Sequence, residues 1–370
     1  MPVLEYLSGT LPQSVSREPK IVSYIDPVQD RRWNQFVDVH PRGCLFHSSA
    51  WLEALSRTYG YKPVAFTTSA AERSLKNGIV FCQVESWLTG RRLVSLPFSD
   101  HCEPLVDGEE DIHALAAILE EESKGGQWRY VEMRPLQPFE ISAALPRVTV
   151  PYTFHRLDLT PDLRTLFRNC HKDSTQRKVT RAEREGLKYS EGTTEDFLEH
   201  FYRLLTITRK RHRRPPQPRQ WFENLIDCFG DALKIRVAFK GDEAVSALLT
   251  IRHKKTMYYK YGGSDRRFNH LGTMHLVMWR AIEEAKNSGL HYFDFGRTDA
   301  GQEGLITFKR RWGSEQSDLI YSRYGLSDKI THRFEPSDSN WQARLANLVL
   351  AHMRPGFLSV VGRALYRHVG

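Results

Sequence analysis

The feature that most constrains this chain is an internal duplication. Residues 48–133 carry the apolar periodicity of a helix, three strands, a break, a second helix and a closing strand, and residues 218–297 repeat that order. Trp51 in the first copy matches Trp221 in the second, 170 positions later. Such a repeat predicts two copies of one α/β (α+β) fold rather than one large sheet, each with a mixed, mostly antiparallel sheet flanked by helices. Chance similarity between two unrelated sheet-and-helix domains is the alternative.

The repeat divides the chain into three parts. Residues 1–155 form the first domain, which we expect on the acceptor side and without a donor site of its own. Residues 156–330 form the second, which we expect to carry the donor site and a basic helical insertion at 163–188. Residues 331–370 form a basic tail whose apolar residues alternate with arginines. This tail predicts an amphipathic segment that either docks on the core or makes peripheral contact with the inner face of a membrane.

Composition and cysteine usage indicate an ordinary globular protein. The chain has 370 residues, 40% of them hydrophobic, which is enough for two domains with large cores. No leader pattern opens the chain and no run approaches the roughly 20 apolar residues of a membrane span, so we expect a cytoplasmic protein. The five cysteines are far apart and odd in number, which predicts neither a disulfide framework nor a bound metal. No feature sets an oligomeric state.

The net charge of +9 is concentrated between residues 156 and 219, which hold 16 Lys and Arg against 9 Asp and Glu. Residues 203–219 carry seven basic side chains and no acidic one, and they include Arg211 and His212. Such a run predicts either phosphate binding, to a nucleic acid or an acidic acceptor, or a solvated surface. His212 precedes two prolines, so we expect it on a loop that covers the acceptor site.

A glycine-containing turn before a helix marks the candidate donor site. A strand at 256–261 leads through a loop to a helix that begins at Thr273. Gly272 and Thr273 would present backbone N–H groups and the positive end of the helix to the phosphates of a donor. Asn269 and Leu271 belong to the same loop. A plain helix cap is the alternative.

Four short segments resemble one known family. They are the run 171–186, the strand Tyr259-Lys260-Tyr261-Gly262, the strand end Asp294-Phe295-Gly296-Arg297 and the helix end Phe308-Lys309-Arg310-Arg311-Trp312-Gly313. Together they resemble the FemAB-type transferases, the branch of the GNAT (N-acetyltransferase) superfamily that includes peptidoglycan-bridge aminoacyltransferases and acetyltransferase-like proteins of polysaccharide gene clusters. Residues 96–101 and 215–218 are similar to the polysaccharide-cluster members. The resemblance covers about residues 30–325 and implies two tandem GNAT-type domains that transfer an acyl or aminoacyl group.

Our principal prediction is acyl transfer, with acetyl as the expected group, from acetyl-CoA or another acyl-CoA. The expected acceptor is an amine or hydroxyl of a cell-envelope or exopolysaccharide precursor, either a small molecule or a glycan or lipid-linked one. Many CoA-binding members carry Arg or Gln three residues before the loop glycine, where this chain has Asn269. One alternative is therefore aminoacyl transfer from tRNA, which the basic segment suits because Lys and Arg neutralise phosphates. The other is a noncatalytic nucleic-acid-binding protein.

Direct attack on the donor needs a base and a group that stabilises the oxyanion. Asp294, at the end of the strand after the donor helix, is our candidate base, and Tyr261 is the candidate donor to the oxyanion or leaving group. Lys309 and Arg297 are expected to bind phosphate or carboxylate, Lys309 on the donor and Arg297 on the acceptor. The alternatives are an ion pair between Asp294 and either cation, and core packing for Tyr261.

Acceptor binding is assigned to further polar residues, because ligand sites often fall between domains and beside mobile loops. They are Asp100 and His101 at the break in the first copy, His171, Lys172 and Arg177 in the charged insertion, and Arg211 and His212 in the basic run. Turn capping or a solvated helix face is the alternative for each.

Overall fold

The computed structural model describes residues 21–87, 90–325, 366 and 368. The first copy comprises β1 (Ser23–Ile25), α1 (Arg31–Val39), η1 (Leu45–His47), α2 (Ser49–Tyr59), β2 (Lys62–Thr67), β3 (Ile79–Ser86), β4 (Gly90–Val94), α3 (Glu109–Lys124), β5 (Tyr130–Met133) and β6 (Arg147–Asp158). The charged insertion that follows comprises α4 (Leu163–Asn169), η2 (Lys172–Gln176) and α5 (Arg177–Arg184). The second copy comprises β7 (Lys188–Gly192), α6 (Glu195–Arg211), α7 (Arg219–Phe229), η3 (Gly230–Ala232), β8 (Leu233–Lys240), β9 (Glu243–His253), β10 (Thr256–Ser264), η4 (Arg266–Leu271), α8 (Thr273–Asn287), β11 (Tyr292–Asp299), α9 (Glu303–Arg310) and β12 (Glu315–Tyr324).

The two copies share one pattern of strands and helices, which confirms the predicted fold class. Within each copy three neighbouring strands are antiparallel, β2–β3–β4 in the first and β8–β9–β10 in the second. A helix then leads to a strand that pairs in parallel with the last of the three, β5 with β4 and β11 with β10. The predicted helices at 109–124 and 273–287 are α3 and α8.

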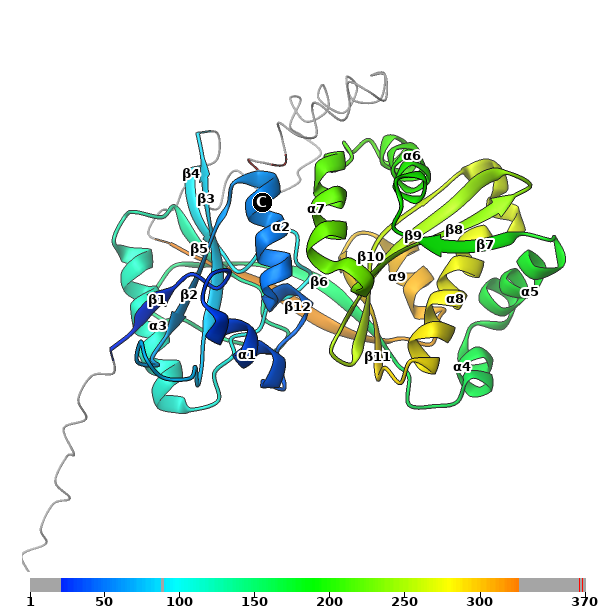
Figure 1. Cartoon of the computed structure of the whole chain (residues 1–370). Coiled ribbons are helices and arrows are strands. Elements are labelled where there is room, and N and C mark those ends of the chain that lie inside the picture. Colours follow the sequence, from blue (N-terminus) through cyan, green and yellow to red (C-terminus); the bar gives the residue numbers. More distant parts are fainter. Residues whose placement is uncertain (1–20, 88–89, 326–365, 367, 369–370) are drawn as a thin grey trace, which may run out of the picture.

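The copies nevertheless share one continuous sheet, which differs from our expectation. The described strands lie in the order β1-β2-β3-β4-β5-β12-β6-β11-β10-β9-β8-β7. β6 follows β5 in sequence but pairs with β11, whereas β12 follows β11 and pairs with β5. β6 and β12 also pair with each other along ten residues and join the halves across the middle of Figure 1. The predicted boundary at residue 155 falls inside β6.

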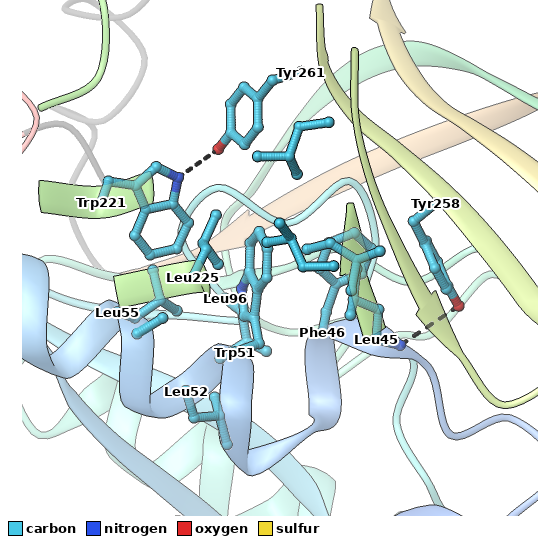
Figure 2. Packing of buried hydrophobic residues seen from close by; sticks show 14 of the residues in the cluster. Leu45, Phe46, Trp51, Leu52, Leu55, Leu96, Trp221, Leu225, Tyr258 and Tyr261 are labelled. Atoms are coloured by element: carbon cyan, nitrogen blue, oxygen red, sulfur yellow. Dashed lines mark hydrogen bonds between the residues drawn. The ribbon is translucent and has the colours of Figure 1, made fainter. Parts of the chain in front are cut away.

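The two copies pack against each other through a hydrophobic core between α2 and α7. Ser48 caps α2 by accepting a hydrogen bond from the Trp51 backbone N–H at 3.3 Å, and Gly60 ends the helix in the left-handed conformation. The corresponding tryptophans, Trp51 and Trp221, pack edge to face with ring centroids 5.3 Å apart (Figure 2). Both are fully buried, so the interface between the copies is part of the hydrophobic core.

The strands β10 and β11 separate after a short parallel contact. They pair only where 256–258 lies beside 292–294, after which β10 follows β9 and β11 follows β6. Each strand carries a bulge at this point, one between Tyr259 and Tyr261 and one between Asp294 and Gly296. In the first copy the corresponding space is bridged, because the Arg134 guanidinium donates to the Leu96 carbonyl at 2.5 Å. In the second copy the corresponding space stays open as a wedge between β10 and β11, where a pocket lies.

The insertion and the tail differ in how far they are described. The predicted helical stretch at 163–188 is interrupted at Cys170 and His171 and contains one π-helical turn, η2. The tail lies outside the described residues except for Tyr366 and His368, so its predicted membrane contact stays a prediction. In the described part, no helix combines the length and the hydropathy that crossing a bilayer requires.

Candidate active site

The wedge between β10 and β11 contains a pocket of about 660 Å³. The end of α6 and the helix α9 complete its walls. The lining residues are Asp100, Thr208, Arg209, His212, Arg214, Tyr259, Lys260, Tyr261, Gly262, Phe295, Arg297, Thr298, Asp299, Gln302, Gly304, Leu305 and Lys309. Five of these are Lys or Arg and two are Asp, so the lining has a surplus of three positive charges. Such a pocket favours an anionic ligand.

A buried ion pair lies at the base of the pocket. The Lys260 Nζ is 2.5 Å from Asp100 Oδ2, and the ammonium also lies over the ring of Phe46 at 4.5 Å. Burial alone would raise the pKa of Asp100, but Lys260, Arg297 and Lys309 outweigh it and hold that pKa below its ordinary value. The side chain keeps 18% of its surface exposed, so the pocket presents a carboxylate at neutral pH.

Gly296 sets the geometry around Asp100 and Lys309. Its φ is +69°, and a Cβ there would lie 2.9 Å from the Asp100 carboxylate carbon, so a side chain would fill the space that the carboxylate occupies. The Gly296 carbonyl accepts a hydrogen bond from Lys309 Nζ at 2.8 Å, and the Arg297 carbonyl accepts another at 2.9 Å. Burial lowers the pKa of Lys309 to about 8, although Asp100 and Asp294 oppose the shift.

Arg297 occupies the wall next to this pair. Its guanidinium lies over the Tyr152 ring at 4.3 Å and donates to Asp299 Oδ1 at 3.1 Å. The planar guanidinium is therefore held in one orientation, with its side chain 31% exposed toward the pocket. An anchored arginine in this position suits a carboxylate or phosphate.

The end of α6 supplies the cationic rim. Arg209, His212 and Arg214 line the pocket, and the Arg214 guanidinium lies 3.4 Å from Asp299 Oδ2. Burial, with the charges of Arg211 and Arg214, lowers the pKa of His212, so its imidazole is neutral at pH 7. Arg211 lies next to these residues in sequence but does not line the pocket.

The structure brings five predicted site residues into this pocket. They are Asp100, His212, Tyr261, Arg297 and Lys309. Tyr261 is largely buried and its hydroxyl accepts a hydrogen bond from the Trp221 indole at 2.8 Å (Figure 2). Lys260, Arg209 and Asp299 also line the pocket but were not predicted as site residues, although a lysine inside the apolar strand Tyr259-Lys260-Tyr261 was a usable signal.

Asp294 and His101 lie behind the pocket rather than in its wall. The bulge at Phe295 shifts the alternation of side chains along β11, so Asp294 does not face the wedge as we expected. Its carboxylate accepts a hydrogen bond from the Gly296 N–H at 2.6 Å and lies 3.3 Å from His101 Nε2. Burial opposes the imidazolium, but Cys44 and Asp294 outweigh it and raise the pKa of His101 to about 10.

The predicted donor loop lies apart from the lining residues. Asn269, Leu271, Gly272 and Thr273 are located where η4 joins α8, and none lines the pocket. A Cβ on Gly272 would lie 2.3 Å from the Lys178 carbonyl oxygen, so α5 covers this turn. The predicted phosphate-binding turn is therefore covered by another segment of the chain and does not line the pocket.

The other predicted acceptor residues lie on the charged insertion. His171, Lys172 and Arg177 are exposed on η2 and the start of α5, and none lines the pocket. The His171 N–H donates to the Arg311 carbonyl at 2.8 Å, which places this segment beside the end of α9. No three His, Cys, Asp or Glu side chains gather as a metal site would require among the described residues, and metal-free chemistry stays a prediction.

One protein family and two curated relatives match parts of this chain. Residues 171–310 match the family described as "Acetyltransferase (GNAT) domain". The chain is 25% identical over 158 residues to the UDP-N-acetylmuramoylpentapeptide-lysine N(6)-alanyltransferase of Weissella viridescens, a match that covers 41% of this chain and 46% of the relative. It is 34% identical over 80 residues to the Lipid II:glycine glycyltransferase of Staphylococcus saprophyticus, covering 20% and 19% of the two chains. These matches span less than half the length of either relative.

Solved structures show the same fold. The crystal structure of FemX superposes with a TM-score of 0.62 at 16% identity, and the match covers 80% of this chain and 96% of that one. A tandem GNAT protein from the clavulanic acid biosynthesis pathway superposes with a TM-score of 0.51 at 11% identity, over 83% and 100% of the two chains. The first likeness supports the overall fold, and the second supports its division into two GNAT-type units.

These matches confirm the predicted family resemblance and overturn the principal functional prediction. Acetyl transfer from a CoA thioester is wrong as the main function, because the two curated relatives are named as an alanyltransferase and a glycyltransferase. The alternative of aminoacyl transfer is the better supported one. A noncatalytic nucleic-acid-binding protein finds no support, since the matched domain is an acetyltransferase domain.

Proposed function

We propose that this chain, an acyltransferase of the FemAB type within the GNAT superfamily, transfers an aminoacyl group from aminoacyl-tRNA to a primary amine on the peptide of a peptidoglycan precursor. The observation that carries the proposal is the pocket itself, which combines a surplus of positive charge with the Asp100 carboxylate and a buried Lys309 ammonium. The names of the two curated relatives supply the class of acceptor.

Asp100 is proposed to receive the acceptor amine. A carboxylate whose pKa is held low stays ionised at neutral pH and accepts a hydrogen bond from the N–H of the neutral acceptor amine. Lys260 fixes one carboxylate oxygen at 2.5 Å, so the carboxylate has a defined orientation when the amine arrives. During attack the nitrogen becomes positively charged, and Asp100 stabilises that charge.

Lys309 is proposed to act on the ester of the donor. The amine attacks the ester carbonyl, a C–N bond forms, and the Lys309 ammonium stabilises the oxyanion of the tetrahedral intermediate. When the C–O bond to the ribose breaks, Lys309 gives a proton to the departing ribose oxygen. The attacking nitrogen then releases its proton and restores Lys309. A pKa of about 8 allows this exchange near neutral pH.

Asp294 and His101 are proposed as positioning residues. The Asp294 carboxylate holds the Gly296 N–H, and the carbonyl of the same Gly296 holds Lys309 Nζ. His101 holds the other oxygen of Asp294. The pair thus fixes the turn on which both Lys309 and Asp100 depend, without contact to the reacting atoms. Tyr261 shapes the pocket wall, where its bond to Trp221 restrains it.

A donor-discharge assay tests the proposal. The protein is mixed with tRNA that carries a radiolabelled amino acid, and loss of label from the RNA is followed with and without a muramyl pentapeptide that ends its side chain in a primary amine. We expect discharge that depends on the acceptor and is lost when that amine is acetylated. Discharge that is indifferent to the acceptor, or a label that stays on the tRNA, overturns the proposal.

A further inference from the structure

A second cationic surface lies outside the pocket, on the charged insertion and α9. We name it the α5–α9 patch and define it by its exposed cations: Arg168, Lys172, Arg177, Arg310 and Arg311. Two segments far apart in sequence form it. The Arg311 carbonyl accepts hydrogen bonds from the His171 N–H at 2.8 Å and from the Thr175 hydroxyl at 3.1 Å, so the end of α9 is fastened to η2.

None of the five patch cations forms an ion pair with a described residue. Three arginines elsewhere in the same half are neutralised by carboxylates. Arg219 pairs with three glutamates, and Arg267 and Arg280 pair with two carboxylates each. Within 168–178 the single carboxylate is that of Asp173. Unpaired cations that lie close together repel one another, which raises the free energy of this surface. A polyanionic partner removes that repulsion.

The helix α9 connects the patch to the pocket. Lys309 is buried and lines the pocket, whereas the next residues, Arg310 and Arg311, are exposed. Successive residues on a helix point about 100° apart, so α9 presents one cation to the reaction and two to the outer surface. A polyanion whose end enters the pocket can therefore continue across the patch.

The composition of the patch distinguishes an RNA from a membrane. Membrane-surface segments combine cations with exposed apolar side chains that enter the lipid. No large hydrophobic side chain is strongly exposed at the described positions between 163 and 187, and on α9 the one that is, Leu305 at 36%, lines the pocket. A surface of cations alone matches duplex RNA, which proteins bind mainly through shape and phosphate contacts.

We propose that the α5–α9 patch binds the phosphate backbone of the acceptor stem of the tRNA donor and so aligns its 3′ ester with Lys309. This assignment rests on the proposed function. The positive charge then has two roles. The cations that line the pocket bind the reacting ends of the substrates, and the cations of the patch bind the RNA duplex.

The binding test uses an unacylated tRNA acceptor-stem minihelix labelled with a fluorophore. The triple variant Lys172→Ala/Arg177→Ala/Arg311→Ala is compared with a control, Lys62→Ala/Arg73→Ala/Lys76→Ala, that removes the same charge from exposed positions of the first copy. Each lost phosphate contact lowers the salt dependence of binding by about 0.7 to 0.9 in the log–log slope. We expect the patch variant to bind on the order of 10- to 100-fold more weakly with a slope reduced by about two to three, and the control to match the wild type.

A kinetic test separates the patch from the pocket. With the full-length aminoacyl-tRNA, the patch variant should lose kcat/KM in proportion to its lost affinity. With an aminoacyl ester of the 3′ terminal trinucleotide, which has no stem, it should match the wild type. An equal loss with both donors overturns the proposal, because the defect then lies in the pocket.

Three further outcomes are distinct. If the wild type binds the minihelix and both triple variants bind it equally, the patch assignment is wrong while aminoacyl transfer from tRNA stands. If the wild type neither binds RNA nor uses either donor, the proposed function fails and the patch assignment fails with it. Loss of binding to phosphatidylglycerol vesicles in the patch variant, with RNA binding intact, also overturns the proposal and identifies a membrane face.

Discussion

Lys260 and Lys309 both line the pocket but have different hydrogen-bond partners. We assign them different roles for this reason. Lys260 is bonded to the carboxylate of Asp100, so its charge is already neutralised. Lys309 is bonded to two backbone carbonyls, which satisfy its hydrogen bonds but leave its positive charge free to meet an oxyanion. A buried cation without a bonded counterion is costly, and such groups are concentrated at functional sites.

The first prediction concerns Lys309. Lys309→Met should lower kcat by about 100- to 1,000-fold with little change in KM, because one oxyanion-stabilising group is removed from the transition state. Lys255→Met, at an exposed position, is the matched control. Steady-state kinetics of both variants decide the matter, and a Lys309 variant that keeps full kcat removes this residue from the reaction.

The pH profile gives a second prediction, on Asp294. The ammonium of Lys309 is lost as pH rises through its pKa of about 8, so wild-type kcat should fall above that pH. Asp100 and Asp294 raise this pKa, whereas burial, Lys260 and Arg297 lower it. Asp294→Asn removes one favourable charge and keeps an oxygen for the Gly296 N–H, so the alkaline limb should move to lower pH. A lower rate with an unmoved limb would mean that Asp294 has only a structural role.

At the scale of secondary-structure elements, the geometry of the site depends on the bulged strand β11. Gly296 combines a left-handed φ with direct packing against the Asp100 carboxylate. Gly296→Ala should cost about 1 to 3 kcal/mol of unfolding free energy and abolish transfer, because the backbone is strained and the carboxylate is displaced. Gly301→Ala, whose Cβ would meet no atom within 4 Å, is the control. Denaturant unfolding and kcat measure the two effects, and an active Gly296→Ala variant contradicts the assigned geometry.

The sequence predicted most elements but not their local distortions. The helices α3 and α8 end where the sequence places their boundaries, because apolar periodicity and a terminal glycine define them. The bulge of β11 has no comparable sequence signal, so the prediction placed Asp294 in the wedge. The cover of α5 over Gly272 is a tertiary contact between segments far apart in sequence, and local patterning does not report it.

At the scale of the whole molecule, the duplication was visible in sequence, but the exchange of β6 and β12 was not. The repeat defined two units through matched residues such as Trp51 and Trp221. Which strand pairs with which depends on long-range pairing, and a strand of either copy satisfies the same hydrogen bonds. The site is built from both copies, because Asp100 comes from the first and Lys260 from the second.

The shared sheet and core predict one cooperative unfolding transition. Trp221→Ala should lower the free energy of unfolding by about 3 to 5 kcal/mol, because it leaves a cavity between the copies. Trp87→Ala, where the side chain is 86% exposed, should change it by less than about 0.5 kcal/mol. Urea unfolding followed by fluorescence and by circular dichroism should give coincident curves. Two separate transitions would contradict a single folding unit.

The most direct measurement of the central claim is the mass of the product. Purified protein, aminoacyl-tRNA and a muramyl pentapeptide with a free side-chain amine are incubated, and the peptide is analysed by mass spectrometry with fragmentation. We predict a peptide heavier by one aminoacyl residue, attached through an amide at that amine, with the wild type and with Lys255→Met, and far less of it in the same time with Lys309→Met. An unmodified peptide, or one modified only when acetyl-CoA replaces the charged tRNA, would contradict it.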